Sequence, residues 1–384
     1  MSRLARVIAP LAAIALAALL VPVTAHGAVD PAVVDGGVGY LATTQIGGTD
    51  ASAGAGAWDS SVPSVFNTFD AVLGIAEAAQ TGATWNTTEA FDAVDGFENA
   101  DGTSPLAYMD LVGNAAAGVG AGRAAKIITL WAEPLGLDPT EFDPAGNGGG
   151  VDLVSIVGLP MVNGAYADAL HFSDTLYAAL AVHLVGGTVS PITVQYIRDG
   201  QGATGFWNYD HDPSDVDAAD VDSTSLAIQA LIAAGVPATD PAIVKGLSYI
   251  ASQQEPDGRW FFFGSPSSET TSRALLAIAA AGFDVNSRCW RDTVLPSSAT
   301  DPFVGGDDAL SSFAQEDGSI ADPTSFGPTY STAQSLEGLL RNWLPVVSGT
   351  PNNCEAPVSP STPVVPGSPT FVAAPVEVTP RFTG

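Results

Sequence analysis

Basic residues are scarce in this 384-residue sequence. Lysine and arginine together number 12 against 41 aspartates and glutamates, which gives a formal net charge of -29 at pH 7. A chain this acidic repels polyanions, so nucleic acids and anionic membrane surfaces are excluded as partners. It also lacks the clustered cations that hold a diphosphate. Solubility, or adaptation to an extracellular or salty medium, is the simplest interpretation of the charge.

Cysteine is nearly absent as well. Cys289 and Cys354 are the two in the chain, and they do not have the spacing of metal ligands. In an exported protein a disulfide between them is expected. It would tie residue 354 back to residue 289. Two free buried thiols are the alternative.

Beyond the N-terminus, no apolar run is long enough to span a bilayer. The N-terminus itself has the features of a secretory signal: Arg3 and Arg6 precede an uncharged apolar stretch from Val7 to Val23. Small residues at 25–28 then suit cleavage. We therefore predict a signal peptide over 1–28. The protein is expected to be secreted, without membrane insertion, and either soluble or associated with the cell wall.

The C-terminal composition differs from the rest. Residues 355–384 contain seven prolines among serine, threonine and valine. This composition predicts an extended, disordered, proline-rich tail. The folded domain is thereby expected over residues 29–354.

Within that domain, Ala- and Leu-rich runs of helical spacing recur about every 50 residues. Five of them end at a glycine, which suits a left-handed helix C-cap, and a sixth run at 331–344 lacks it. A period near 50 fits a two-helix unit. The five glycines are Gly82, Gly136, Gly186, Gly235 and Gly282.

Shorter helical stretches alternate with these runs, and most are followed by a glycine, one residue and an aromatic ring. The glycine permits a tight turn and the ring is expected to pack on the neighbouring helix. Helices that are apolar on nearly every side should be buried. Six such units therefore predict an all-α fold, an α/α toroid of about six two-helix repeats with the Ala-rich helices inside. The clearest corners are Gly56-Ala-Trp58, Gly164-Ala-Tyr166, Gly205-Phe-Trp207 and Gly258-Arg-Trp260.

One of these corners resembles a known repeat. The pattern Gln254-x-x-Asp257-Gly258-x-Trp260 is similar to the Gln-Trp repeats of squalene-hopene cyclases and to the related prenyltransferase repeats. The resemblance covers about residues 30–345 and also implies an α/α toroid. The segment from Gly122 to Leu153 resembles secreted toroids related to the cobalamin carriers, transcobalamin and intrinsic factor. Those carriers close over a corrinoid with a C-terminal β-domain, whereas this chain ends in a proline-rich tail.

The cyclase resemblance implies a candidate general acid. Class II terpene cyclases protonate an alkene with an aspartate of an Asp-x-Asp-Asp motif, and this sequence reads Asp220-Val221-Asp222-Ser223. Asp222 matches the proton donor, with Asp220 as its companion. Such an acid must stay protonated and face an apolar, aromatic-lined cavity. Rings for ligand binding are expected from the corners and their neighbours, namely Trp207, Tyr209, Trp260 and Phe262.

A structural role for these aspartates is the competing interpretation. When the apolar runs are aligned on their glycines, Ser223 falls in one column with polar residues of the other repeats, and threonines fill the next column. Such a pattern is typical of a repeated helix N-cap. Asp222 lies directly before that column, so capping or another structural role is favoured for it. The other members of the column are Asp70, Asp174, Thr270 and Ser331.

The stretch 208–222 is the densest acidic run. Its carboxylates are hard oxygen ligands that suit Ca²⁺. The EF-hand pattern fails, however, because Asp215 stands where glycine is required and Val221 where glutamate is required. A solvated acidic loop is the simpler interpretation. The calcium candidates are Asp210, Asp212, Asp215 and Asp217.

These observations favour an exported, non-catalytic toroid that binds a bulky apolar or corrinoid-like ligand, or a surface partner. One alternative is a terpene-cyclase-like enzyme, a squalene or polyprene cyclase or mutase, with Asp222 as the acid. Another is a structural protein associated with the cell wall. No cofactor is assigned with certainty, and corrinoid and calcium stay open.

Overall fold

The computed structural model describes residues 29–60, 65–166, 171–322 and 326–348. The predicted signal peptide, the proline-rich tail and Cys354 lie outside the described residues. The signal, the tail and the disulfide to Cys289 therefore stay predictions. No helix of the described part combines the length and apolar character that a membrane crossing requires.

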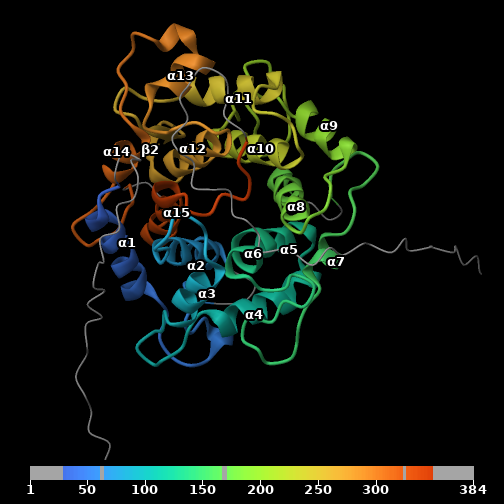
Figure 1. The fold of residues 1–384 in the computed structure, drawn as a ribbon, viewed down its shortest axis with the longest axis vertical. Coiled ribbons are helices and arrows are strands. Elements are labelled where there is room, and N and C mark those ends of the chain that lie inside the picture. The colour runs from blue at the N-terminus through green and yellow to red at the C-terminus, as the bar shows by residue number, and fades with distance from the viewer. Residues whose placement is uncertain (1–28, 61–64, 167–170, 323–325, 349–384) are drawn as a thin grey trace, which may run out of the picture.

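The described chain forms a closed ring of helices in two layers (Figure 1). Each inner helix packs on the next around the ring, and the last packs on the first. The predicted α/α toroid is thereby confirmed. The inner helices are α2 (Phe66–Ala78), α5 (Ala121–Ile127) with the π-helical turn η3 (Ile128–Ala132) and α6 (Glu133–Leu135), α8 (Phe172–Leu184), α10 (Val221–Ala233), α12 (Ser268–Ala280) and α15 (Pro328–Leu340).

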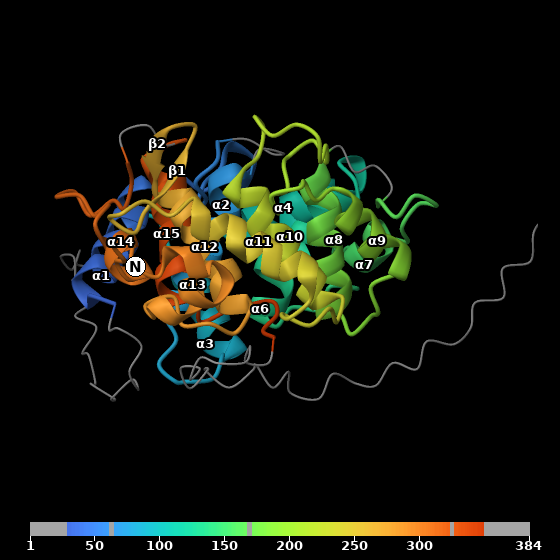
Figure 2. The same ribbon diagram turned by 90° about the horizontal axis from the view of Figure 1, so that it is seen from above.

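Further helices lie outside this ring (Figures 1 and 2). They are α1 (Pro31–Thr44), α4 (Leu106–Ala115), α7 (Leu153–Val157), α9 (Pro191–Asp199), α11 (Pro241–Ser252), α13 (Arg288–Val294) and α14 (Gly306–Ser311). Helix α3 (Thr87–Asp95) lies against α2 and α6. Short 3-10 turns are η1 (Ala51–Ala53), η2 (Ala116–Gly118) and η4 (Pro296–Ser298). Strands β1 (Trp260–Phe262) and β2 (Ser265–Ser267) form an antiparallel hairpin with Trp260 opposite Ser267.

The glycine-aromatic corners join the two layers. Gly205 has φ +100°, and a Cβ there would lie 2.2 Å from the Lys245 carbonyl oxygen of α11. Two residues later, the Trp207 indole N–H donates to the carbonyl of Ile197 in α9 at 2.6 Å. Its backbone N–H donates to the Thr224 hydroxyl of α10 at 2.9 Å. The corner therefore fastens an outer helix to the start of an inner one.

The same connection recurs around the ring. The Trp260 backbone N–H donates to the Thr271 hydroxyl at 3.1 Å, and its indole N–H donates to the Ile250 carbonyl at 2.8 Å. In the last repeat, a Cβ on Gly318 would lie 2.7 Å from the carbonyl oxygen of Gly36 in α1, so this corner seals the ring against the first helix. The repeated threonines thus hold corners. Further pairs of this kind are Trp58 with Thr68, Tyr166 with Thr175 and Ile320 with Thr332.

Replacing Thr271 with valine tests this connection. Valine keeps the shape but removes the acceptor of the Trp260 N–H and the donor to the Ser267 carbonyl, and all these groups are buried. We expect the free energy of unfolding to fall by about 1–3 kcal/mol, measured by denaturant titration. Thr88→Val on the exposed face of α3 is the control, with an effect within about 0.5 kcal/mol. Equal effects in the two variants would contradict the role of Thr271.

Candidate active site

The inner helices are largely buried. Five of them carry a polar or aromatic residue that is only partly buried, and these residues form a belt along the inner layer. The belt includes Lys126 of α5, Tyr177 of α8, Asp222 of α10, Arg273 of α12 and Tyr330 of α15.

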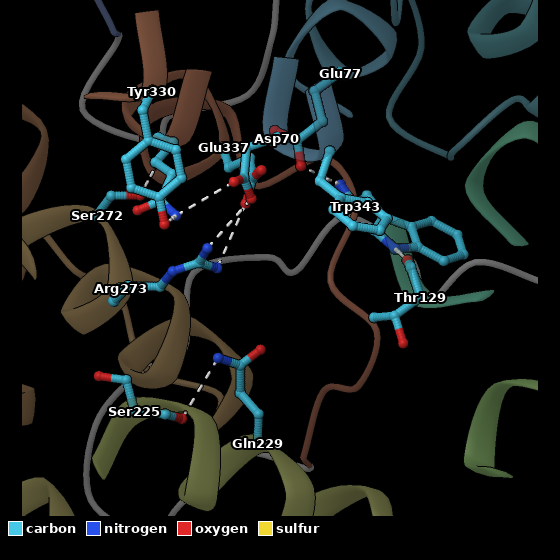
Figure 3. Close-up of polar contacts among 12 residues, drawn as sticks. Asp70, Glu77, Thr129, Ser225, Gln229, Ser272, Arg273, Tyr330, Glu337 and Trp343 are labelled. Carbon is cyan, nitrogen blue, oxygen red and sulfur yellow. Dashed lines mark hydrogen bonds and ion pairs between the residues drawn. The ribbon is translucent and has the colours of Figure 1, made fainter. Parts of the chain in front are cut away.

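Arg273 is the centre of this interior (Figure 3). Its guanidinium lies 3.2 Å from Asp70 Oδ1 of α2 and 3.6 Å from Glu337 Oε2 of α15. Asp70 is fully buried, and Gln334 donates to its other oxygen at 3.4 Å. The cluster therefore joins three inner helices across the ring.

The two carboxyls of this cluster differ in charge. Burial works to raise the pKa of Asp70, but the Lys126 and Arg273 cations and hydrogen bonds from Glu337 and Gln334 lower it below its ordinary value. Burial and the charge of Asp70 raise the pKa of Glu337 well above its ordinary value. Asp70 therefore loses its proton more readily than Glu337 and is the favoured anionic partner of Arg273.

The start of α10 separates the two aspartates of the acid motif. Asp220 is the N-cap, and its carboxylate accepts the backbone N–H of Ser223. Burial, followed by the charge of Asp222, raises the pKa of Asp220 to about 7. Its geometry is that of a cap, and the role of companion acid is not needed to explain it.

Asp222 is the second residue of the helix and does not cap it. It lies three residues before Ser225 and seven before Gln229, so the three share one face of α10. Figure 3 shows Ser225 and Gln229 on the side of α10 that faces Arg273. Asp222 Oδ1 is buried, and no hydrogen-bond partner for it lies among the described residues.

The electrostatics of Asp222 suit a proton donor. Burial raises its pKa to about 6, although the Arg273 cation and the Thr270 hydroxyl oppose the shift, and Glu269 adds to it. A carboxyl of this kind retains its proton in mildly acidic solution. It also interacts electrostatically with Arg273 and Tyr330, two other residues of the inner helices.

The predicted N-cap column is wrong by one helical turn. Ser223, Thr270 and Asp174 each lie three residues after the true N-cap, which is Asp220, Ser267 and His171 respectively. The two other members are interior residues: Asp70 pairs with Arg273, and the Ser331 hydroxyl donates to Glu269 at 2.5 Å. The alignment was anchored on the helix ends, whereas the starts are set by local hydrogen bonds.

A cluster of aromatic rings lies at the end of the ring where the inner helices begin. We call these residues the aromatic rim. Phe66 opens α2 and lies 4.5 Å from the ring of Tyr330 in the first turn of α15, while Phe262 of β1 lies 5.6 Å from Phe326. Phe66 and Phe326 are 53% and 65% exposed, so the rim is open to a ligand. Its members are Phe66, Phe262, Phe263, Phe326 and Tyr330.

The four aromatic residues predicted to bind a ligand fall into two groups, two near this end of the ring and two buried in the corners. Phe262 belongs to the aromatic rim. Tyr209 is 48% exposed and its ring lies 4.5 Å from that of His171, the N-cap of α8, so it is near the same end of the ring. Trp207 and Trp260 are 0% exposed with their indole N–H groups bonded, so the prediction of ligand contact is wrong for both. The indole rings of both residues pack inside the corners.

The opposite end of the interior is covered by the segment 342–348. The Trp343 indole donates to the Thr129 carbonyl of η3 at 3.2 Å, and its backbone N–H donates to Glu77 of α2 at 3.2 Å (Figure 3). The Ser348 N–H donates to the Ala280 carbonyl of α12 at 2.7 Å. These bonds reach three inner helices near their C-terminal ends. A hollow of about 410 Å³ remains at this end between the segment and the ends of α8 and α10. The exposed rings of the aromatic rim lie at the other end.

The predicted calcium loop does not gather its carboxylates. Asp212 accepts from Ser214, and Asp215 accepts from the backbone N–H groups of Asp217 and Ala218. Asp210, Asp212, Asp215 and Asp217 are all exposed. Across the described ranges, no three such side chains are placed to hold a metal ion. The loop is a solvated one whose aspartates bond their own turns.

Sequence reasoning missed Lys126, Tyr177, Arg273 and Tyr330. A usable signal was present, because Lys126 and Arg273 are cations within Ala- and Leu-rich runs of a chain with only 12 basic residues. A charge at such a position requires a partner or a ligand.

Comparison with known proteins identifies the fold. No family model matches the sequence, and no curated protein matches it. Among solved structures, the type II terpene cyclase MstE from Scytonema without ligand is similar at a TM-score of 0.51 and 14% identity, over 80% of this chain and 96% of that chain.

Two ligand complexes of MstE variants are also similar. The complex with merosterolic acid A, described as the product, has a TM-score of 0.53 and 14% identity, over 80% of this chain and 95% of that chain. The complex with geranylgeranyl dihydroxybenzoate, described as the substrate, has the same TM-score and identity, over 81% of this chain and 96% of that chain. The chain thus has a terpenoid-cyclase-like helical fold.

Proposed function

We propose that this chain is a terpene-cyclase-like enzyme that isomerises an apolar polyprene by protonating an alkene with Asp222. One observation carries the proposal: a carboxyl on an inner helix has a raised pKa, interacts with the central Arg273, and has a buried oxygen without a hydrogen-bond partner among the described residues. Burial of such a group without a hydrogen bond is unfavourable. Functional sites are where such arrangements concentrate.

The reaction that this geometry supports is a proton transfer without redox change. The O–H bond of neutral Asp222 breaks, a C–H bond forms at one alkene carbon, and the other alkene carbon becomes cationic. A second alkene of the same chain then attacks the cation and closes a ring. Loss of a proton from a neighbouring carbon to water ends the sequence, and the Asp222 carboxylate takes a proton back from water, so the product is an isomer of the substrate.

Arg273 stabilises the state that follows proton transfer. Its cation favours the charged form of Asp222. The carboxylate left after donation is therefore held by a fixed positive charge, which lowers the energy of the charge-separated state. Tyr177 and Tyr330, which interact electrostatically with Arg273, add aromatic faces to the same space. Such faces attract a developing carbocation.

The aromatic rim supports an apolar substrate. It exposes rings at one end of the interior, whereas segment 342–348 partly covers the other end. A polyprene chain passing the rim would bury its surface against these rings. This arrangement favours the enzyme over the non-catalytic toroid. Export is proposed separately from 1–28, and N-terminal sequencing of the mature protein tests it.

The direct test uses isotope labelling. Purified protein is incubated in D₂O with squalene or with a geranylgeranyl compound, and products are analysed by mass spectrometry. The proposal predicts a cyclised product carrying deuterium from the initiating protonation. Products that are absent, or that retain only protium, would contradict proton-initiated cyclisation.

The proposal also fixes the direction of the pH dependence. The general acid acts when protonated, and the pKa of Asp222 is raised to about 6. The rate kcat/KM is therefore expected to be highest below about pH 6 and to fall roughly tenfold per pH unit well above it. A pH–rate profile from pH 4.5 to 8.5 measures this, with protein stability recorded over the same range. A rate that rises with pH through this window would contradict Asp222 as the acid.

A further inference from the structure

Lys126 is a cation of the interior that makes no direct ion pair among the described residues. It lies on α5, and within the described ranges it makes neither an ion pair nor a hydrogen bond. Its ammonium instead lies 4.8 Å from the ring centre of Phe69 and 5.6 Å from that of Tyr177. The nearby Asp70 is already bound by Arg273 and Gln334. Within contact distance the ammonium therefore meets ring faces, while the Asp70 carboxylate acts on it electrostatically without a direct ion pair.

Lys126 and Asp222 lie on different inner helices, with one inner helix between them. Helix α5 packs on α8, and α8 packs on α10, so Tyr177 of α8 comes between Lys126 and Asp222 along the inner wall. Leu226 lies one turn after Asp222 on α10 and is also partly exposed. A cation is therefore followed by an aromatic and an aliphatic surface and then by the acid.

From this order we infer that Lys126 binds the carboxylate of an isoprenoid acid, whose hydrocarbon chain passes Tyr177 and Leu226 toward Asp222. A single ammonium is a point charge suited to a monoanion. A diphosphate requires several clustered cations, and Arg123, on the same helix, already faces the charges of Asp174 and Asp59. The inference rests on the proposed function, since it places the substrate of the same site. Anchoring the head group would hold an alkene remote from the carboxylate beside Asp222.

The test compares binding of geranylgeranoic acid with that of geranylgeraniol, its uncharged counterpart, by calorimetry on the full protein. The acid is expected to bind the wild-type protein about tenfold tighter or more, the size of a charge-assisted hydrogen bond. In Lys126→Met the ratio should fall to about one, and Lys126→Arg should restore most of it. Binding of the alcohol shows whether the apolar site is intact. The ratio of the two affinities, acid to alcohol, therefore separates recognition of the charge from loss of folding.

The chain offers a matched control, because Lys245 is its other lysine and is exposed on the outer helix α11. Lys245→Met should leave the ratio unchanged. Equal affinities for acid and alcohol in the wild type, or a preference that survives Lys126→Met, would overturn the carboxylate site while leaving the cyclase proposal standing. Tighter binding of geranylgeranyl phosphate than of the acid by more than tenfold would overturn the choice of carboxylate. Binding of none of these ligands would count against both proposals.

Discussion

Asp222→Asn is expected to lower kcat by about 10²- to 10⁴-fold, the range that a positioned general acid contributes. Asparagine has nearly the same shape but cannot donate the proton of a carboxylic acid to an alkene. The fold should be retained, because Asp222 does not cap α10 and its Oδ1 has no hydrogen-bond partner among the described residues. Turnover of a polyprene, followed by mass spectrometry, measures the effect.

Asp220→Asn is the matched control for this variant. Asparagine caps a helix as well as aspartate does, and Asp220 accepts its capping bond from Ser223. This variant should keep turnover within a few-fold of wild type. Comparing the two variants separates the effect of the Asp222 carboxyl from that of the Asp220 carboxyl, two residues away. If Asp222→Asn retained more than a tenth of the wild-type rate, or if Asp220→Asn were the inactive one of the two, Asp222 would not be the acid.

Arg273→Met is expected to lower the free energy of unfolding by about 3–5 kcal/mol, the cost of removing one partner of a buried ion pair. Asp70 is fully buried and ionised, and Arg273 is only 14% exposed. Methionine fills much of the volume but leaves the carboxylate without its closest cation. Denaturant unfolding at pH 7 measures the change.

The pH dependence of this loss follows from Asp70. Its lowered pKa contributes stability above the pKa of aspartate in an unfolded chain, about 3.9, and this contribution is lost as the pH falls through the folded-state pKa. The variant lacks most of it, so the difference from wild type should shrink below about pH 4.

Two further variants complete the test of Arg273. Adding Asp70→Asn to Arg273→Met should recover part of the loss, because it removes the buried charge. Arg259→Met is the control, since Arg259 pairs with a half-exposed Asp257 and should cost no more than about 1 kcal/mol. A loss in Arg273→Met that matches the control would show that the cluster does not stabilise the ring.

The sequence was informative wherever local chemistry sets the structure. Gly186, Gly235 and Gly282 all have positive φ after α8, α10 and α12, as the helix-end pattern predicts. Gly205 and Gly258 likewise turn the corners that pack Trp207 and Trp260. At positive φ the Cβ of other residues clashes with the backbone, so glycine is favoured there. This preference depends on one residue alone, and a single glycine in the sequence can therefore mark such a position.

The candidate site was only half visible in the sequence. The motif around Asp222 drew attention to a residue of the interior, but the column of Ser223 was assigned to caps because alignment on helix ends cannot locate helix starts. Asp220 and Asp222 differ in their places in α10, because Asp220 is the N-cap and Asp222 lies inside the helix. The hydrogen bond from Ser223 to Asp220 marks that helix start.

By itself the sequence determined the repeat, the inner and outer helices and the acid motif, because helix periodicity and glycine geometry are local properties. The closed ring and its interior were decided by tertiary structure. Asp70 and Arg273 are 203 residues apart in the chain and meet only because α15 returns to α2 and α12 packs beside it. Lys126 and Tyr177 likewise come together from different repeats. Pairings of this kind depend on ring closure, which brings distant helices into contact and which no short stretch of sequence encodes.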